Sequence, residues 1–182
     1  MNPALPPRPE LARLVVDLCR LRGGPQDVPY SPNLLVALFV AGIALDTLGG
    51  SINADAGTAL ASSLLSNGVV LALCWIALTI RGQGNRYVQT ASALLACSFA
   101  FTLLQLPLAW LGGPPPATAA ELGGLQILLG WAMIAVFLWQ VAVSAHIMRH
   151  AMDAPYGLAL ALVVAWVLAY WALDGALFGA SA

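Results

Sequence analysis

The stretch 56-AGTALASSLLSNGVVLALCWIALTI-80 contains no charged residue, and Asn67 carries its only amide side chain. A helix needs about 20 mostly apolar residues to cross the roughly 30 Å of hydrocarbon in a bilayer. Lipid offers the backbone no hydrogen-bond partners, so a stretch of this kind has to be helical. The segment therefore predicts a transmembrane helix over residues 56–80.

Four further apolar stretches meet the same criterion, at about 33–50, 87–111, 122–148 and 154–178. The chain of 182 residues is 60% hydrophobic and 8% charged, whereas soluble domains carry about 25% charged residues. We therefore expect an all-α membrane protein, a bundle of five transmembrane helices that forms a single domain over 1–182. The lipid bilayer is its first expected partner. The net charge of −1 argues against a surface that binds nucleic acid.

The basic residues, all of them arginines, orient this bundle. They precede the first span, separate the second from the third, and close the fourth, at Arg8, Arg13, Arg20, Arg22, Arg81, Arg86 and Arg149. In a five-span protein all of these positions fall on one side, which the positive-inside rule assigns to the cytoplasm. The use of arginine without any lysine, together with much alanine and leucine, suggests a GC-rich bacterial genome. We therefore expect a bacterial inner-membrane protein with a cytoplasmic N-terminus and a periplasmic C-terminus.

An amphipathic segment, residues 9–22, precedes the first span. Its apolar side chains follow helical spacing on one face, and its charged side chains follow it on the other. The segment is too short and too charged to cross a bilayer. We expect a helix that lies on the cytoplasmic leaflet with its leucines in the acyl boundary. The alternative is a helix packed under the bundle or against a partner.

Polar residues inside the spans are the first candidates for function, because each is costly in lipid unless it faces protein or water. The candidates are Asp46, Asn67, Gln105, Gln140 and Asp174. The two aspartates lie near the outer span ends and could frame one acidic vestibule or simply reach the interface. The three amides suit either hydrogen bonds between helices or contacts to a substrate. Convergence of these residues on one cavity would favour a transporter or channel, and separate helix contacts would argue against it.

A second candidate site lies at the inner end of the fourth span, where His146, His150 and Asp153 follow at i, i+4 and i+7. Two imidazoles one helical turn apart can bind zinc or iron. The same residues also suit the membrane interface or a pH-sensitive contact. Asp153 precedes Pro155, where the helix is expected to break, so its place on that face is open. The sequence contains no recognisable cofactor motif or catalytic signature, and we expect no cofactor.

Ahead of the first span, the stretch 27-DVPYSP-32, together with five spans and a cytoplasmic N-terminus, resembles the Yip1 family in topology over most of the chain. The Asp-Leu-Tyr-Gly-Pro motif of that family is matched in part, with a proline inserted and serine in place of glycine, by Asp27, Val28, Tyr30 and Pro32. The resemblance implies a non-enzymatic membrane organiser or adaptor.

Three functional hypotheses follow from the sequence. The first is a non-enzymatic accessory subunit that binds other membrane proteins or itself, because the chain has little extramembrane mass and no catalytic signature. The second is a small transporter or channel subunit with a polar path through the spans. The third is a metal-dependent membrane enzyme that uses His146 and His150.

Overall fold

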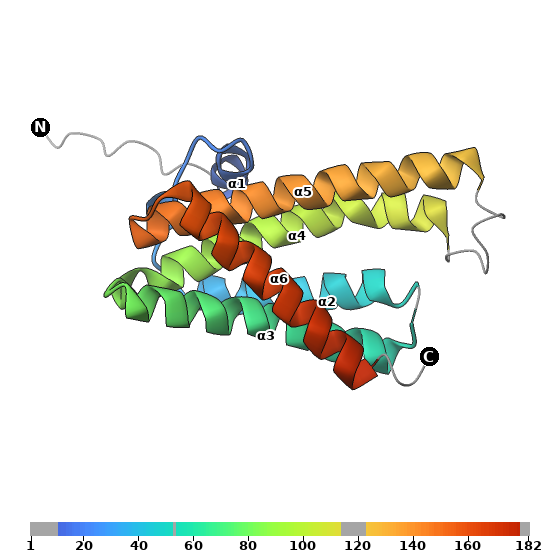
Figure 1. Ribbon diagram of the computed structural model, residues 1–182, viewed down its shortest axis with the longest axis horizontal. Coiled ribbons are helices and arrows are strands. Elements are labelled where there is room, and N and C mark those ends of the chain that lie inside the picture. Colours follow the sequence, from blue (N-terminus) through green and yellow to red (C-terminus); the bar gives the residue numbers. More distant parts are fainter. Residues whose placement is uncertain (1–10, 53, 114–122, 179–182) are drawn as a thin grey trace, which may run out of the picture.

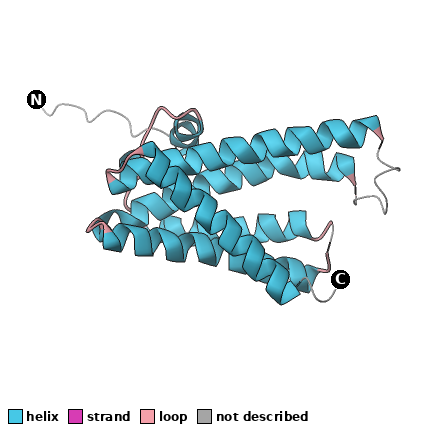
Figure 2. Ribbon diagram, viewed as in Figure 1, coloured by secondary structure: helices cyan, strands magenta, loops and turns pink. Residues whose placement is uncertain are grey.

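The structure is a computed structural model that describes residues 11–52, 54–113 and 123–178. Its described part consists of helices joined by short loops (Figure 2), and no strand occurs within it. The α-helices are α1 (Leu11–Cys19), α2 (Pro32–Gly50), α3 (Ala56–Ile80), α4 (Tyr87–Gly112), α5 (Gly124–Met152) and α6 (Tyr156–Phe178). Two short 3-10 helices, η1 (Pro25–Asp27) and η2 (Gly84–Arg86), lie in the connections. Helices α2 to α6 are long and apolar enough to cross a membrane, which confirms the predicted five-span membrane protein.

The five long helices form two antiparallel pairs, α2 with α3 and α4 with α5, and α6 crosses both (Figure 1). Helix α6 starts beside α5 and ends beside α3. Arg81, Arg86 and Arg149 come together at one end of the bundle, which we call the basic end. Asp55 and Asp174 lie at the opposite end, which we call the acidic end.

Local sequence signals explain where the spans begin. Ser31 caps α2 by accepting a hydrogen bond from the backbone N–H of Leu34 at 3.2 Å, and Pro32 follows at the first helical position. Asp55 caps α3, and its carboxylate accepts bonds from the N–H groups of Gly57 and Thr58 at 2.9 and 3.1 Å. The predicted bounds of α2, α3 and α4 agree with the structure to within one residue.

The fourth span differs from its prediction at its inner end. Helix α5 continues to Met152, four residues past the predicted end at 148, while residue 122 lies outside the described residues. Asp153 ends the helix in the left-handed conformation, at φ 49°. There the N–H of Ala154 bonds to the carbonyl of Arg149 at 3.0 Å. The apolar run ends at residue 148, but the helix continues to Met152. Hydropathy marks the residues that suit lipid, whereas hydrogen bonds set the last turn of a helix.

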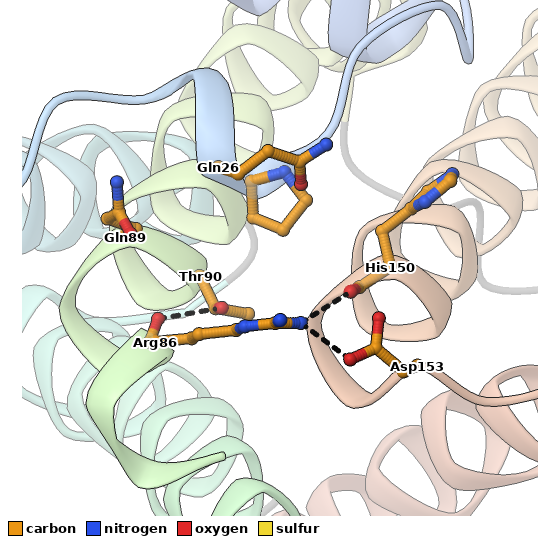
Figure 3. A pocket seen from close by; sticks show the side chains of 7 residues that line it. Gln26, Arg86, Gln89, Thr90, His150 and Asp153 are labelled. Carbon is orange, nitrogen blue, oxygen red and sulfur yellow. Dashed lines mark hydrogen bonds and ion pairs between the residues drawn. The ribbon is translucent and has the colours of Figure 1, made fainter.

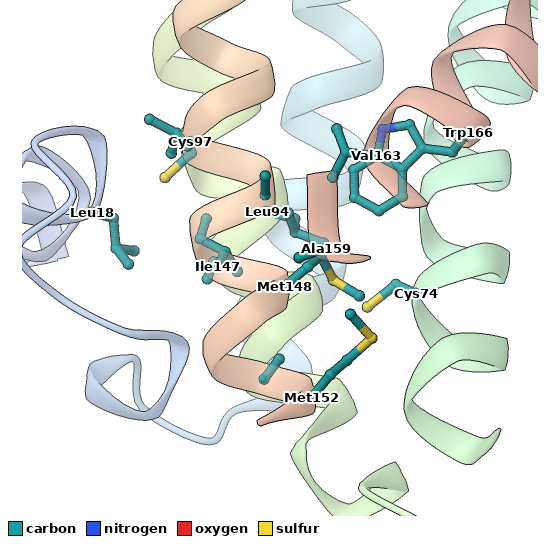
Figure 4. Packing of buried hydrophobic residues seen from close by; sticks show 14 of the residues in the cluster. Leu18, Cys74, Leu94, Cys97, Ile147, Met148, Met152, Ala159, Val163 and Trp166 are labelled. Atoms are coloured by element: carbon teal, nitrogen blue, oxygen red, sulfur yellow. The ribbon is translucent and has the colours of Figure 1, made fainter. Parts of the chain in front are cut away.

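The protein core lies in the half of the bundle nearer the basic end. Cys74 and Leu78 from α3 meet Met148 and Met152 from α5, with Ala159, Val163 and Trp166 from α6 around them (Figure 4). All of these side chains are buried. Helix α4 runs through the centre, and its residues 90–97 are buried without a break. Among the described residues, these buried apolar side chains fill the half of the bundle nearer the basic end.

Helix α1 lies crosswise to the spans, against α4 and α5 (Figure 1). Leu18 is 1% exposed and joins the core, while Arg13 on the charged face of α1 is exposed. The helix ends at Cys19 and not at the predicted residue 22, because Leu21 takes a left-handed conformation at φ 60°. Residues 9 and 10 of the predicted segment lie outside the described residues. An amphipathic helix thus exists here and packs on the bundle, and its place on a leaflet stays a prediction.

Candidate functional site

The predicted intramembrane polar residues gather around one open cavity of about 570 Å³ near the acidic end, which we call the acidic cavity. All five long helices contribute to its wall. The polar lining residues are Asp46, Thr58, Ser62, Ser63, Ser66, Ser98, Thr102, Gln105, Gln140, Tyr170 and Asp174. No arginine, lysine or histidine is among the described residues that line it. The cavity is therefore a polar, negatively charged space between otherwise apolar helices.

Three side chains from three helices form what we call the Asp46 clasp: Asp46 of α2, Asn67 of α3 and Thr102 of α4. Asn67 donates its amide to Asp46 Oδ2 at 3.0 Å, and Thr102 donates its hydroxyl to Asp46 Oδ1 at 2.9 Å. Asn67 also donates to the backbone carbonyl of Ser63 at 2.9 Å. Both oxygens of Asp46 thus accept a hydrogen bond, and the carboxyl group ties α2 to its two neighbours.

The second carboxylate, Asp174 of α6, sits in a chain of hydroxyl groups. Ser62 of α3 donates to Asp174 Oδ1 at 2.5 Å, and the hydroxyl of Tyr170 lies 2.9 Å from Ser62 Oγ. Tyr170 also reaches Asp174 with its hydroxyl, so Ser62, Tyr170 and Asp174 form one hydrogen-bonded group. Asp174 is partly exposed. A carboxylate has about four lone-pair sites, so Asp174 can accept a further donor from the cavity.

The two glutamines complete the wall on the side of α4 and α5. Gln105 donates to the side-chain carbonyl of Gln140 at 3.4 Å, and Gln140 donates to Ser98 Oγ at 3.5 Å. These bonds are long, so each contributes little to packing. Both amides can turn their donors and acceptors toward a solute in the cavity.

A smaller hollow of about 170 Å³ adjoins the acidic cavity, and we call it the aromatic hollow. The two spaces share Ser66, Ser98, Gln140 and Tyr170 as lining residues. The apolar and aromatic lining residues of the hollow are Val70, Leu94, Leu95, Phe137, Trp166, Val167 and Trp171. The rings of Phe137 and Trp171 stack at 6.0 Å between centroids. A polar cavity thus lies next to a hollow with a largely apolar and aromatic lining.

Sequence reasoning identified some of these residues and missed others. Asp46, Gln105, Gln140 and Asp174 line the acidic cavity, and Asn67 supports it through Asp46 while lining the hollow. The hydroxyl-bearing residues Ser62, Ser66, Ser98, Thr102 and Tyr170 were missed. One signal was available, since Thr58, Ser62 and Ser66 follow every fourth position on α3 and so share one face.

A separate pocket of about 300 Å³ lies at the basic end, between η1, α4 and the end of α5 (Figure 3). There the guanidinium Nη1 of Arg86 bonds to the carboxylate of Asp153 at 2.9 Å and to the carbonyls of His150 and Ala151 at 3.4 Å each. A cation on these last carbonyls completes the end of the helix and complements its dipole. Arg86 thus acts as a side-chain cap of α5.

The predicted metal ligands are only partly brought together. The rings of His146 and His150 touch at 4.5 Å between centroids. His146 Nε2 lies 2.9 Å from the carbonyl oxygen of Gly23, and Asp153 turns to Arg86. Among the residues that the structure describes, no group of three or more His, Cys, Asp or Glu side chains is placed to hold a metal ion. A metal site here stays a prediction without geometric support.

Two cysteines meet where α1 rests on the bundle. The thiol of Cys97 in α4 hydrogen-bonds to Cys19 and lowers the pKa of Cys19, while partial burial acts in the opposite direction. Trp139 of α5 donates its indole N–H to the carbonyl of Cys19 at 2.9 Å. These contacts fasten the end of α1 to both α4 and α5.

Comparison of the chain with protein-family models, curated proteins and solved structures finds no match.

Proposed function

We propose that this integral membrane protein binds a positively charged solute in the acidic cavity and takes part in its transport across the membrane. One observation carries the proposal. Asp46 and Asp174, from α2 and α6, line the same cavity, and no basic side chain is among the described residues that line it. A cavity with walls of low dielectric constant and charge of one sign concentrates ions of the opposite sign.

The surrounding groups suit a cation as well. The lining offers carboxylate, hydroxyl and amide oxygens from all five long helices. Ionisable residues inside membrane helices are costly, and they commonly mark the paths of ions and substrates. The convergence of four of the five predicted polar residues on one cavity favours the transport hypothesis over scattered helix contacts.

Transport also needs access from the opposite side, which the buried core closes. Cys74, Met148 and Val163 are at most 1% exposed and lie on their helices between the residues that line the cavity and the basic end. The bundle therefore represents a state that is open at the acidic end. We expect α6 to move when access changes sides, because it crosses both helix pairs (Figure 1) and contributes Tyr170 and Asp174 to the cavity.

The charge of the cavity can be tested with thiol reagents. Ser66 lines both the cavity and the hollow, so Ser66→Cys, in a chain whose native cysteines are replaced, reports on both. A cationic methanethiosulfonate should react at least about tenfold faster than an anionic one, the lower end of known focusing effects. Asp46→Asn combined with Asp174→Asn should bring the two rates together. Ser51→Cys, an exposed position at the same end outside the cavity lining, is the control.

Transport itself is measured in proteoliposomes, as charge movement after a jump in ethylammonium concentration. The protein should give a current that Asp174→Asn abolishes, whereas liposomes without protein give none. Equal rates for the two thiol reagents at Ser66→Cys would contradict the cation-binding cavity. A faster reaction with the cationic reagent but no current would support cation binding and contradict transport.

The partner-binding hypothesis is kept as a second candidate. Helices α4 and α5 extend beyond α2 and α3 at the acidic end (Figure 1). Near the start of α5, Leu125, Leu128 and Trp131 are 62 to 66% exposed, which suits contact with lipid or with another membrane protein. The Yip1-like adaptor role belongs to this candidate and stays a prediction. Co-purification of a specific partner, lost on Trp131→Ala with Leu128→Ala, would support it.

A further inference from the structure

We infer that the solute is an arylalkyl ammonium ion, with its ammonium group at Asp174 and a single aromatic ring in the aromatic hollow. The inference rests on the proposed cation-binding function and adds to it the chemical class of the solute. Two unlike spaces lie side by side and share four lining residues. The acidic cavity carries the charges, and most of the other residues that line the adjacent hollow are aromatic or aliphatic.

The hollow has the size of one aromatic ring. Its volume is about 170 Å³, and an apolar protein cavity of about 150 Å³ is known to bind benzene. A bare metal ion would leave this space empty. Phe137, Trp166 and Trp171 supply ring faces and edges that favour offset or edge-to-face contact with a bound ring.

The ammonium end is assigned to Asp174 because the two carboxylates differ in their partners. Asn67 and Thr102 of two neighbouring helices hold both oxygens of Asp46, whereas the neighbours of Asp174 are the hydroxyls of Ser62 and Tyr170, which can turn to other acceptors. A carboxylate has about four lone-pair sites, so Asp174 can accept an ammonium N–H beside these hydroxyl groups. Asp46 adds a second negative charge to the cavity and holds its wall in place.

The spacing between the two subsites fits a short linker. Tyr170 lines both spaces, and Asp174 follows it by one helical turn on α6, which separates the two residues by about 6 Å along the helix axis. A two-carbon chain between ring and nitrogen spans a comparable distance. The face of Tyr170 can further stabilise the ammonium group through a cation–π contact.

The test is calorimetric titration of the purified protein in mild detergent with three probes. They are 2-phenylethylammonium, ethylammonium, which lacks the ring, and 2-phenylethanol, which lacks the charge. Burial of the ring predicts that 2-phenylethylammonium binds at least about tenfold tighter than ethylammonium. Asp174→Asn should weaken both ammonium ions and leave 2-phenylethanol unchanged.

A variant that fills the hollow separates the contribution of the ring to affinity from that of the charge. Val70→Phe should remove the preference for the ring while ethylammonium binding is retained, which also shows that the variant is folded. Val167→Phe, on another helix, is the second variant, and Val36→Phe, at a position 61% exposed, is the matched control. Equal affinities of the two ammonium ions, or a preference that survives both filled variants, would overturn the inference. In that case, a faster reaction of Ser66→Cys with the cationic than with the anionic reagent would still support the proposed function. Equal rates with the two reagents would contradict both the proposed function and the inferred solute.

Discussion

Replacing Asn67 by alanine should loosen α2 from α3, because it removes one of the two donors of the Asp46 clasp. A hydrogen bond to a charged group contributes about 1.5 to 3 kcal/mol in soluble proteins. Between membrane helices the measured average is about 0.6 kcal/mol with a maximum near 1.7. Asp46 lines an open cavity, so water can take the place of the lost donor. We therefore expect the coupling between Asp46 and Asn67 to be about 1 kcal/mol, which lies in the membrane range.

The coupling is isolated by a double-mutant cycle of Asp46→Ala and Asn67→Ala, since each single variant also changes packing. Unfolding in mixed micelles, followed by tryptophan fluorescence, gives the free energy of each protein. A second cycle of Asp46→Ala with Thr102→Val should give a coupling of similar size. Thr79, exposed at the other end of α3, is the control partner, and its cycle with Asp46 should give none. Coupling energies near zero in both clasp cycles would refute the clasp.

Three further predictions concern the rest of the chain. The Thr58 hydroxyl and backbone N–H groups lower the pKa of Asp55. Its capping of α3 should therefore be fully present above the ordinary aspartate pKa and be lost as pH falls through the lowered pKa. Thr58→Val should raise the pKa of Asp55 in an NMR titration. The contact between Cys19 and Cys97 should give an intramolecular disulfide with copper phenanthroline as oxidant, visible as a gel shift that Cys97→Ala removes. Gly84→Cys should be protected from a membrane-impermeant maleimide added outside intact spheroplasts, and labelling there would reverse the predicted orientation.

The spans could be predicted because lipid imposes one rule on every residue that touches it. The predicted span 56–80 has the same bounds as α3, since Asp55 caps one end of the helix and Arg81 follows the other. The end of α5 could not be predicted in this way. Past residue 148 the helix leaves the apolar run, and its last turn depends on Arg86, a residue from a different helix. Hydropathy contains no information on such a tertiary cap.

The candidate site was predictable only where a side chain is unusual in lipid. Asp46 and Asp174 stand out on that ground, and both line the cavity. Serine and threonine do not stand out, because they can bond to their own helix, as Ser63 does to the carbonyl of Ala59 and Thr90 to that of Arg86. Whether such a hydroxyl faces a cavity depends on the rotation of its helix within the bundle. The hydroxyl chain from Tyr170 to Asp174 therefore required the structure.

The position of α1 on the bundle indicates which part of the bundle lies in the hydrocarbon layer. The segment after α1 meets α5 at His146, through the carbonyl of Gly23. The stretch of α5 from residue 124 to residue 143 is about 30 Å long at about 1.5 Å per residue, which equals the thickness of the hydrocarbon. The charged face of α1 needs water or headgroups, so it fits the boundary that this stretch defines.

On this placement the last turns of α5 and the first turn of α4 stand beyond the hydrocarbon, where lipid cannot cover them. The N-terminal segment takes over that role, since Leu18 and Val28 are each 1% exposed and Gln89 donates to the carbonyl of Val28 at 2.8 Å. The segment contacts α4 and α5 in particular. Any opening of the core toward the basic end that separates these two helices from α3 and α6 would therefore carry the N-terminal segment with it.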